Sequence, residues 1–259
     1  MSPLRWLGGK HKLAALVVAN MPEHHCYCEP FAGACHVFFA KKPSPVEIIN
    51  DVNAELVNFW RVLGRDAGGL MELGRACLYS RAEFVRLARQ NPAELGDVER
   101  AWRFYYLNRA CFGGDPKTSQ DFSGATFGAS RTENRGRLLS RALAKLPGFH
   151  ARLANAVIER LDWADCIERY DSPSTCFYID PPYAGCETDY GKGIWKREDY
   201  ARLAERLCRI SGSFLLSIND TPEMAETFAA FRVVARPSLN YSVNRHRPTR
   251  ARELLLARP

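Results

Sequence analysis

The sequence has no apolar run long enough to cross a membrane. No stretch approaches the roughly 18 consecutive apolar residues that a membrane helix requires, and the early segment LAALVVAN lacks the length and cleavage pattern of a signal peptide. The chain has 259 residues, of which 46% are hydrophobic and 25% charged, so it can bury a sizeable core. We therefore expect a folded, intracellular protein.

Neither a disulfide framework nor a metal site is indicated. The nine cysteines are odd in number and scattered, and several lie in apolar runs such as STCFYI and ERLCRI, so we expect reduced, buried thiols. The segment HHCYCE at residues 24–29 crowds two histidines and two cysteines. A structural zinc site normally has a second ligand pair at a defined distance, and none follows. We expect no metal.

The glycine motifs of nucleotide-binding proteins are incomplete. RWLGGKH at residues 5–11 fails as a P-loop, because Leu4 replaces the first glycine and His11 replaces the Ser or Thr. EPFAG at residues 29–33 does not extend into a full G-x-G-x-x-G, which disfavours NAD and an oxidoreductase.

The net charge of +7 is concentrated in the middle of the chain. Residues 61–150 carry 15 basic and 9 acidic side chains, whereas residues 1–60 carry five of each and residues 151–259 carry 16 and 15. Such an excess indicates either a solvated basic face or a surface that binds nucleic acid.

The apolar pattern predicts an α/β protein. We expect a helix over residues 11–21, then over 26–40 a strand, a glycine turn and the start of an apolar helix, then a strand over 46–51 and a helix over 52–63. This β-α-β-α opening favours a mostly parallel sheet with ligand sites at the carboxyl ends of its strands.

The middle of the chain interrupts this rhythm. We expect helices at residues 80–90 and 98–112 and a long polar loop at 113–136. The remaining predicted strands lie at 156–162, 176–180, 213–220, 231–237 and 252–257. The sequence therefore predicts a catalytic domain formed by residues 1–60 and 151–259, with an inserted domain at 61–150.

The segment TCFYIDPPYAG at residues 175–185 has the features of a slot for a planar ring with an exocyclic amino group. Asp180 ends a buried strand, Pro181 and Pro182 hold the following carbonyls rigid, and Tyr183 offers a flat stacking face. An ordinary strand-ending turn can contain the same residues. However, Gly33 after the first strand and the acid that ends IIND have the spacing of a nucleoside cofactor site.

Eight segments in order give the chain its resemblance to a known family. They are RWLGGK, EPFAG, INDVNAEL, FYYLNRACFGG, LDW, YIDPPYAG, LLSINDTPE and NYSVNRHRPTRARELLLA. The chain resembles a Dam-type, D12-class DNA adenine-N6 methyltransferase of the alpha group. The resemblance implies a Rossmann-like methyltransferase sheet with an inserted, mainly helical target-recognition domain. It also implies double-stranded DNA as partner, a monomer, and a cytoplasmic enzyme of bacterial or phage origin.

The resemblance assigns S-adenosylmethionine as cofactor, without a metal. It places the cofactor against Trp6, Lys10, Phe31, Gly33, Asp51, Asp162, Trp163 and Asp180. Each of these residues has a structural alternative, since an aromatic such as Trp163 is often simply part of a core.

The resemblance also assigns the reaction. Asp180 and the Pro181 carbonyl would accept hydrogen bonds from an adenine amino group, Pro182 would stiffen the turn, and Tyr183 would stack on a base flipped out of the duplex. Direct attack on the cofactor methyl would follow, without a covalent enzyme intermediate. Glycines in the segment after Tyr183 would let it close over the base.

Contacts to DNA are expected mainly from the insert and the tail, and any one of these charges can instead be a solvated surface group. The candidates are Asn108, Arg109, Lys117, Arg131, Arg135, Arg137, Arg245, Arg247 and Arg250.

Two departures from the family pattern limit what is carried over. Cys35 replaces the second glycine of F-x-G-x-G, which puts cofactor approach in question, and GGDPK at residues 113–117 replaces the N-G-x-x-R of members that read GATC. We therefore do not carry over GATC specificity. A methyltransferase acting on RNA or protein, or an inactive DNA-binding relative, stays open as an alternative.

Overall fold

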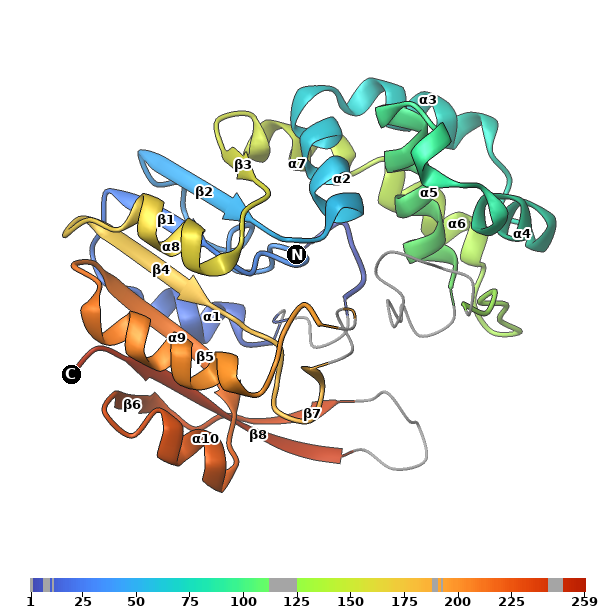
Figure 1. Cartoon of the computed structure of the whole chain (residues 1–259). Coiled ribbons are helices and arrows are strands. Elements are labelled where there is room, and N and C mark those ends of the chain that lie inside the picture. Colours follow the sequence, from blue (N-terminus) through green and yellow to red (C-terminus); the bar gives the residue numbers. More distant parts are fainter. Residues whose placement is uncertain are drawn as a thin grey trace.

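The structure is a computed structural model (Figure 1) that describes residues 2–6, 10, 12–111, 125–187, 191, 193–241 and 249–259. At 239–241 and 249–251 only the backbone is described. Lys117, Arg245 and Arg247 lie outside the described residues, and the side chain of Arg250 is not described.

A mostly parallel β-sheet forms the centre of the molecule. Its strands are β1 (Cys26–Glu29), β2 (Val46–Asn50), β3 (Val157–Glu159), β4 (Thr175–Ile179), β5 (Ser213–Asn219), β6 (Arg232–Ala235), β7 (Ser238–Tyr241) and β8 (Thr249–Ala257). The order is β3-β2-β1-β4-β5-β8-β6, with β7 paired to β8. The first five strands in this order are parallel, and β8 is antiparallel to β5. Chain order reverses between β1 and β4, which is where doubly wound sheets bind ligands.

Helices cover both faces of the sheet, which confirms the predicted α/β fold. One face carries α8 (Trp163–Tyr170), α9 (Glu198–Arg209) and α10 (Pro222–Thr227), and the other carries α1 (Ala14–Ala19), α2 (Ala54–Arg65) and α7 (Leu146–Leu153) (Figure 1). Because both faces are covered, the central strands are continuously apolar; all five residues of β4 are buried.

The middle of the chain is helical, as predicted. It contains α3 (Ala67–Ala76), α4 (Arg81–Arg89), the 3-10 turn η1 (Pro92–Glu94), α5 (Asp97–Ala110) and α6 (Arg135–Leu143). Helix α5 is buried almost all round, and its aromatic residues, such as Trp102 and Tyr105, belong to the same apolar cluster as α2 and one sheet face. This helical segment therefore rests on the sheet through a continuous core.

The helix predicted to start after Gly33 is not formed. Residues 36–40 make hydrogen-bonded turns instead: the Phe39 N–H donates to the Cys35 carbonyl four residues back, but the Ala40 N–H donates to the Val37 carbonyl three residues back. The series of helical hydrogen bonds is therefore broken at Ala40. The Phe38 N–H donates to Glu29 Oε1 at 2.7 Å.

All nine cysteines are reduced, as expected, but only five are buried; Cys186 and Cys208 are exposed. Within the described ranges, no helix is long and apolar enough to cross a membrane, and no group of three His, Cys, Asp or Glu could hold a metal ion. In HHCYCE, His24 instead contacts Pro22 O and Ser44 Oγ.

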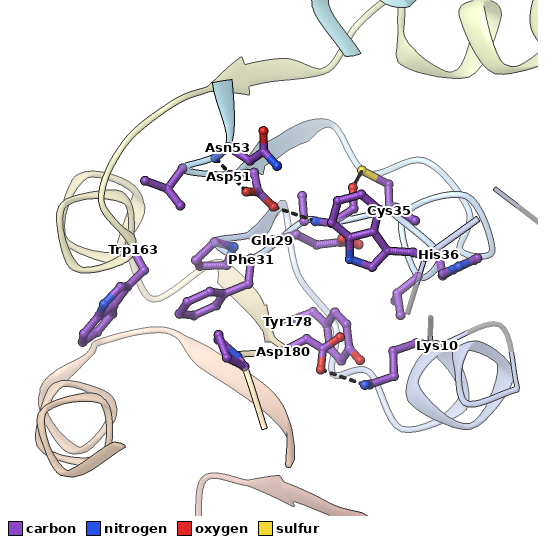
Figure 2. A pocket seen from close by; sticks show the side chains of 18 of the residues that line it. Lys10, Glu29, Phe31, Cys35, His36, Asp51, Asn53, Trp163, Tyr178 and Asp180 are labelled. Atoms are coloured by element: carbon purple, nitrogen blue, oxygen red, sulfur yellow. Dashed lines mark hydrogen bonds and ion pairs between the residues drawn. The ribbon is translucent and has the colours of Figure 1, made fainter. Parts of the chain in front are cut away.

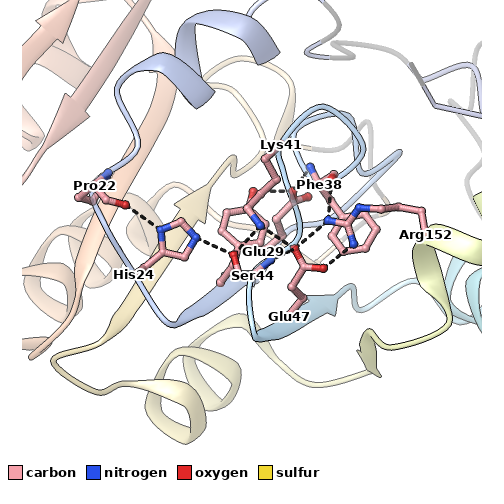
Figure 3. Close-up of polar contacts among 9 residues, drawn as sticks. Pro22, His24, Glu29, Phe38, Lys41, Ser44, Glu47 and Arg152 are labelled. Carbon is pink, nitrogen blue, oxygen red and sulfur yellow. Dashed lines mark hydrogen bonds and ion pairs between the residues drawn. The ribbon is translucent and has the colours of Figure 1, made fainter.

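A buried ionic network joins α7 to the start of β2 (Figure 3). Lys41 Nζ donates to Glu47 Oε1 at 2.6 Å, Arg152 forms a two-point ion pair with the same carboxylate, and Arg152 also donates to the Phe38 carbonyl at 3.0 Å. The Lys41 and Glu47 side chains are 3% and 5% exposed. Burial alone would raise the pKa of Glu47, but hydrogen bonds from Arg152 and Lys41 lower it below its usual value.

Replacing Glu47 by alanine should destabilise the protein by about 3–5 kcal/mol, because two cations would stay buried without their carboxylate. Urea denaturation followed by tryptophan fluorescence measures this. The matched control is Glu168→Ala, which breaks an exposed pair with Arg206 and should cost no more than about 1 kcal/mol. Equal costs for the two variants would show that the network does not stabilise the fold.

Candidate active site

One pocket opens at the carboxyl ends of β1, β2, β3 and β4. It is lined by Trp6, Lys10, Glu29, Phe31, Gly33, Cys35, His36, Asp51, Asn53, Leu161, Asp162, Trp163, Tyr178, Asp180, Pro182, Ile194 and Trp195, among others. All eight residues that the resemblance assigns to the cofactor line this pocket. Figure 2 shows Phe31, Asp51, Trp163 and Asp180, which come from different strand ends, around the same space.

The buried side chain of Asn50 holds three of these strand ends together. Its Nδ2 donates to the carbonyls of Pro30 at 2.9 Å and Leu161 at 3.1 Å, and its Oδ1 accepts from the Leu161 N–H at 2.7 Å. The end of β2 is thereby bonded to the segments that follow β1 and β3. One amide therefore bonds to two of the segments that line the pocket, EPFAG and LDW, from the residue next to Asp51.

The turn after β1 is fixed by Asp51. Gly33 has φ +47°, and its N–H donates to Asp51 Oδ2 at 3.0 Å, while the Asn53 N–H donates to Oδ1 at 3.0 Å. A Cβ on Gly33 would lie 3.0 Å from Trp6 Nε1, so the glycine lets the indole approach the backbone. Burial raises the pKa of Asp51, and these backbone donors oppose the rise.

Cys35 also adopts a left-handed conformation, with φ +53°, at the position where the family has glycine. Its side chain is fully buried, and Sγ lies 3.8 Å from the Gly33 carbonyl oxygen. The backbone therefore keeps a conformation that glycine adopts without strain, even though the side chain is larger.

An aromatic wall closes one end of the pocket. The rings of Phe31 and Trp163 stack with centroids 6.2 Å apart, and Trp195 packs edge-on against Phe31 at 5.5 Å. Asp162, next to Trp163, is the N-cap of α8 and accepts from the Ala164 N–H at 2.9 Å. This cap fixes the start of the helix and with it the indole of Trp163.

At the opposite end, Asp180 is held by charge and by hydrogen bonds. Lys10 Nζ lies 3.1 Å from Asp180 Oδ1, and Ser217 Oγ donates to the same oxygen at 3.0 Å. The Tyr178 hydroxyl lies 2.9 Å from Ser217 Oγ. Burial raises the pKa of Asp180 above its ordinary value, and the Lys10 ammonium opposes the rise.

The turn after Asp180 is stiffened by contacts from one helix and one strand end. Tyr200 of α9 donates to the Pro182 carbonyl at 3.0 Å, and the Asn219 amide at the end of β5 makes two 3.1 Å hydrogen bonds to the backbone of Ala184. Lys10 Nζ lies 4.2 Å from the centroid of the Tyr183 ring. Of the predicted catalytic residues, Asp180 and Pro182 line the pocket. Tyr183 contacts Lys10, which is itself a pocket residue.

The comparisons with known proteins identify the family. The family model for D12 class N6 adenine-specific DNA methyltransferases matches residues 6–239. The chain belongs to this family. The enzyme is thus an adenine-specific DNA methyltransferase with the predicted α/β fold.

Several relatives are similar over most of this chain. The type II methyltransferase M.CviBI of Paramecium bursaria Chlorella virus NC1A is 24% identical, with 89% of this chain and 88% of the relative covered. The DNA adenine methylase of Escherichia coli K12 is 27% identical, with 78% and 73% covered. The DNA N-6-adenine-methyltransferase of Escherichia phage P1 is 28% identical over 90% of this chain but only 32% of its own length.

A solved structure, the rRNA methyltransferase aviRa from Streptomyces viridochromogenes, superposes with a TM-score of 0.40 and 11% identity, over 98% of this chain and 89% of its own. This likeness is too low to bear on the substrate.

The residues predicted to contact DNA have varied positions. Arg131 and Arg137 are exposed, and Arg135 pairs with Glu133 at 2.9 Å. Arg109 at the end of α5 is partly buried, and Asn108 is 1% exposed. Burial and the neighbouring charges of Arg109 and Arg135 lower the pKa of Arg5, so three guanidinium groups lie near one another here.

The sequence alone does not mark several residues that shape the pocket. Asn50, Trp195 and Ser217 each act through contacts with segments distant in the chain. Asn50 and Ser217 belong to the segments INDVNAEL and LLSINDTPE, but the resemblance assigns no role to either residue. Glu29 was part of EPFAG, but its function as a buried hydrogen-bond acceptor for Tyr27 and Phe38 depends on the fold.

Glu29 generates a prediction about stability. It is 2% exposed, and burial raises its pKa to about 8, so the neutral form predominates at pH 7. The carboxyl group therefore favours the folded state fully below its unfolded pKa near 4.5 and loses this contribution as pH rises towards about 8. In Glu29→Gln the side-chain amide does not ionise, so this variant lacks the pH-dependent contribution of the carboxyl group.

The stability of the wild type relative to Glu29→Gln should accordingly fall between pH 5 and 8, by up to about 1.4 kcal/mol per pH unit. Urea denaturation at several pH values measures the difference. A constant difference across this range would mean that the Glu29 pKa is not raised.

Proposed function

We propose that the enzyme transfers a methyl group from S-adenosylmethionine to N6 of an adenine flipped out of duplex DNA, with Asp180 at the junction of the two sites. The observation that supports this most directly is the position of Asp180. It directly follows β4 on the rim of the pocket, is held by Lys10 and Ser217, and is followed at once by the stiffened Pro181-Pro182 turn.

The pocket fits the proposed cofactor in its chemistry. The Phe31, Trp163 and Trp195 rings form an apolar wall suited to a purine, and the Asp51 carboxylate beside it can accept hydrogen bonds from ribose hydroxyls. When bound, S-adenosylmethionine supplies an electrophilic methyl group on a sulfonium. The acidic side chains of Asp51 and Asp180 line the same pocket and suit such a cation.

The residues at the rim suit the activation of an aromatic amino group. The adenine N6 lone pair is delocalised into the ring, so it reacts poorly unless its hydrogens are bound by acceptors out of the ring plane. Asp180 and the Pro181 carbonyl would accept these hydrogen bonds, and the fixed geometry contributes by positioning. Tyr183 would stack on the base. The N6 proton released on methylation would leave to Asp180 or to water.

The adenine must leave the duplex to reach this rim, because the Asp180 carboxylate is partly buried between β4 and Lys10. Flipping costs a few kcal/mol of stacking and pairing. We propose that the inserted segment, residues 61–150, holds the DNA, and that Arg109 and Arg135 of this segment, together with Arg5 beside them, provide positive charge for phosphates or base edges. We propose a monomer as the active form.

Replacing Asp180 by asparagine should lower methyl transfer at least about 100-fold while leaving the fold intact, because the amide keeps the shape but not the charge. The measurement is transfer of labelled methyl from S-adenosylmethionine to duplex DNA pools of defined sequence. Label on adenine N6 in one short motif would also reveal the recognition sequence. Duplex RNA is the control substrate.

Folded wild-type protein that binds the cofactor yet methylates no DNA in any pool would overturn the proposal. Full activity in Asp180→Asn would overturn the role of the carboxylate.

The pH dependence of the rate should move when Lys10 is removed. The Lys10 cation lowers the pKa of Asp180, so Lys10→Met should raise it further, and the acidic limb of the pH-rate profile should shift to higher pH. Ser217→Ala should shift it in the same direction by less.

Lys42→Met, at an exposed lysine, is the matched control and should leave the profile unchanged. An unshifted profile in Lys10→Met would show that Asp180 is not the group that titrates.

A further inference from the structure

Asn108 lies at the end of α5, and its side chain makes two hydrogen bonds to the backbone of Arg5, 103 positions earlier. Its Oδ1 accepts from the Arg5 N–H at 2.9 Å, and its Nδ2 donates to the Arg5 carbonyl at 2.7 Å. Asn108 is 1% exposed. The pair resembles one rung of a β-ladder, made with a side-chain amide.

Further contacts fasten the same two segments. Arg5 donates to the Arg109 carbonyl at 3.2 Å, and Arg109 reaches back to the Pro3 carbonyl at 3.5 Å. Leu4, between them, is 4% exposed and belongs to the apolar core. Residues 3–5 are thus tied to the end of α5 rather than to the sheet.

Trp6, the residue next to Arg5, forms part of the pocket lining. Trp6 lines the pocket, and its indole lies so close to Gly33 that a Cβ there would be 3.0 Å from Nε1. Its placement therefore depends on the backbone at Arg5, and the group that fixes this backbone comes from the helical segment.

We propose that Asn108 is a positioning residue for the cofactor pocket: its amide clamps Arg5 and thereby holds Trp6 over Gly33. This rests on the proposed function, in which the pocket binds S-adenosylmethionine. It gives Asn108 a role other than the DNA contact predicted from the sequence, and it makes the affinity of the pocket dependent on the end of α5.

The residue type fits this role. A side-chain amide carries its acceptor and its donor on two atoms of one planar group, as a peptide does, so both backbone groups of Arg5 are satisfied at once. Aspartate would keep the acceptor but bury a charge and face the Arg5 carbonyl without a proton. Alanine would leave both backbone groups without their partners.

The test compares Asn108→Ala with Asn58→Ala. Asn58 is the matched control, because it is also a buried asparagine in the α2–α5 contact, where its Nδ2 donates to the Asp97 carbonyl at 2.9 Å, but it does not touch residues 2–6. Titration calorimetry with S-adenosylmethionine and S-adenosylhomocysteine gives the affinities. Hydrogen exchange of a peptide covering residues 2–6, measured without ligand, gives the order of the clamped segment.

We expect Asn108→Ala to weaken both ligands about tenfold and to speed exchange in residues 2–6, from the loss of two buried hydrogen bonds. Asn58→Ala should do neither. In steady state, Asn108→Ala should raise KM for S-adenosylmethionine while leaving kcat at saturating cofactor within about twofold.

A second pair of variants covers the case in which Asn108→Ala fails to fold. Arg5→Ala and Arg5→Pro both lose the guanidinium, but only the proline also loses the N–H that Asn108 accepts. Arg5→Pro should bind the ligands more weakly than Arg5→Ala.

Unchanged ligand affinity in Asn108→Ala, or equal affinity in the two Arg5 variants, would overturn this inference alone. If the wild type bound neither ligand, the proposed function would fail together with it.

Discussion

The buried amide of Asn50 is the contact on which the site depends. Parallel strands bring their carboxyl ends to one edge, but the backbone pairing of a sheet ends where the strands end. The Asn50 side chain links the strands beyond that point, since it bonds to the backbone of the segments after β1 and β3. The aromatic wall, the Gly33 turn and Asp51 can then hold fixed distances although they belong to separate loops. The remaining polar contacts of the pocket act on this frame.

The pocket concentrates acid groups in a place where burial works against their charge. Glu29, Asp51 and Asp180 all have a raised pKa, with burial as the main cause. Backbone donors moderate the effect at Asp51, whereas Lys10 does so at Asp180. The protein thus sets the acidity of each carboxyl group separately. Asp180, the one nearest the proposed acceptor base, is paired with the Lys10 ammonium.

The sequence allowed the strands, the strand-end acids and the DPPY turn to be predicted, because each is encoded within a few consecutive residues. Apolar runs that end in an acid mark β2 and β4, and parallel order follows from alternation with helices. The helix expected after Gly33 was wrong, since the Ala40 N–H bonds three residues back rather than four, which no local pattern reveals. Likewise, Trp195 reaches Phe31, and Asn108 reaches Arg5, only after the chain has folded. Contacts between residues a hundred positions apart carry no local signal.

The cysteines differ in reactivity because some are buried and others are exposed. Cys35 at the pocket is fully buried, and burial raises its pKa well above the ordinary value, so little thiolate is available there for alkylation or oxidation. The exposed thiols are Cys208 on the outer side of α9 and Cys186, whose N–H bonds to the Tyr183 carbonyl at 2.8 Å. Modification would therefore begin outside the pocket proposed to bind the cofactor. With Cys208 replaced by serine, a dye would label the exposed Cys186, three residues after the Tyr183 of the proposed base slot.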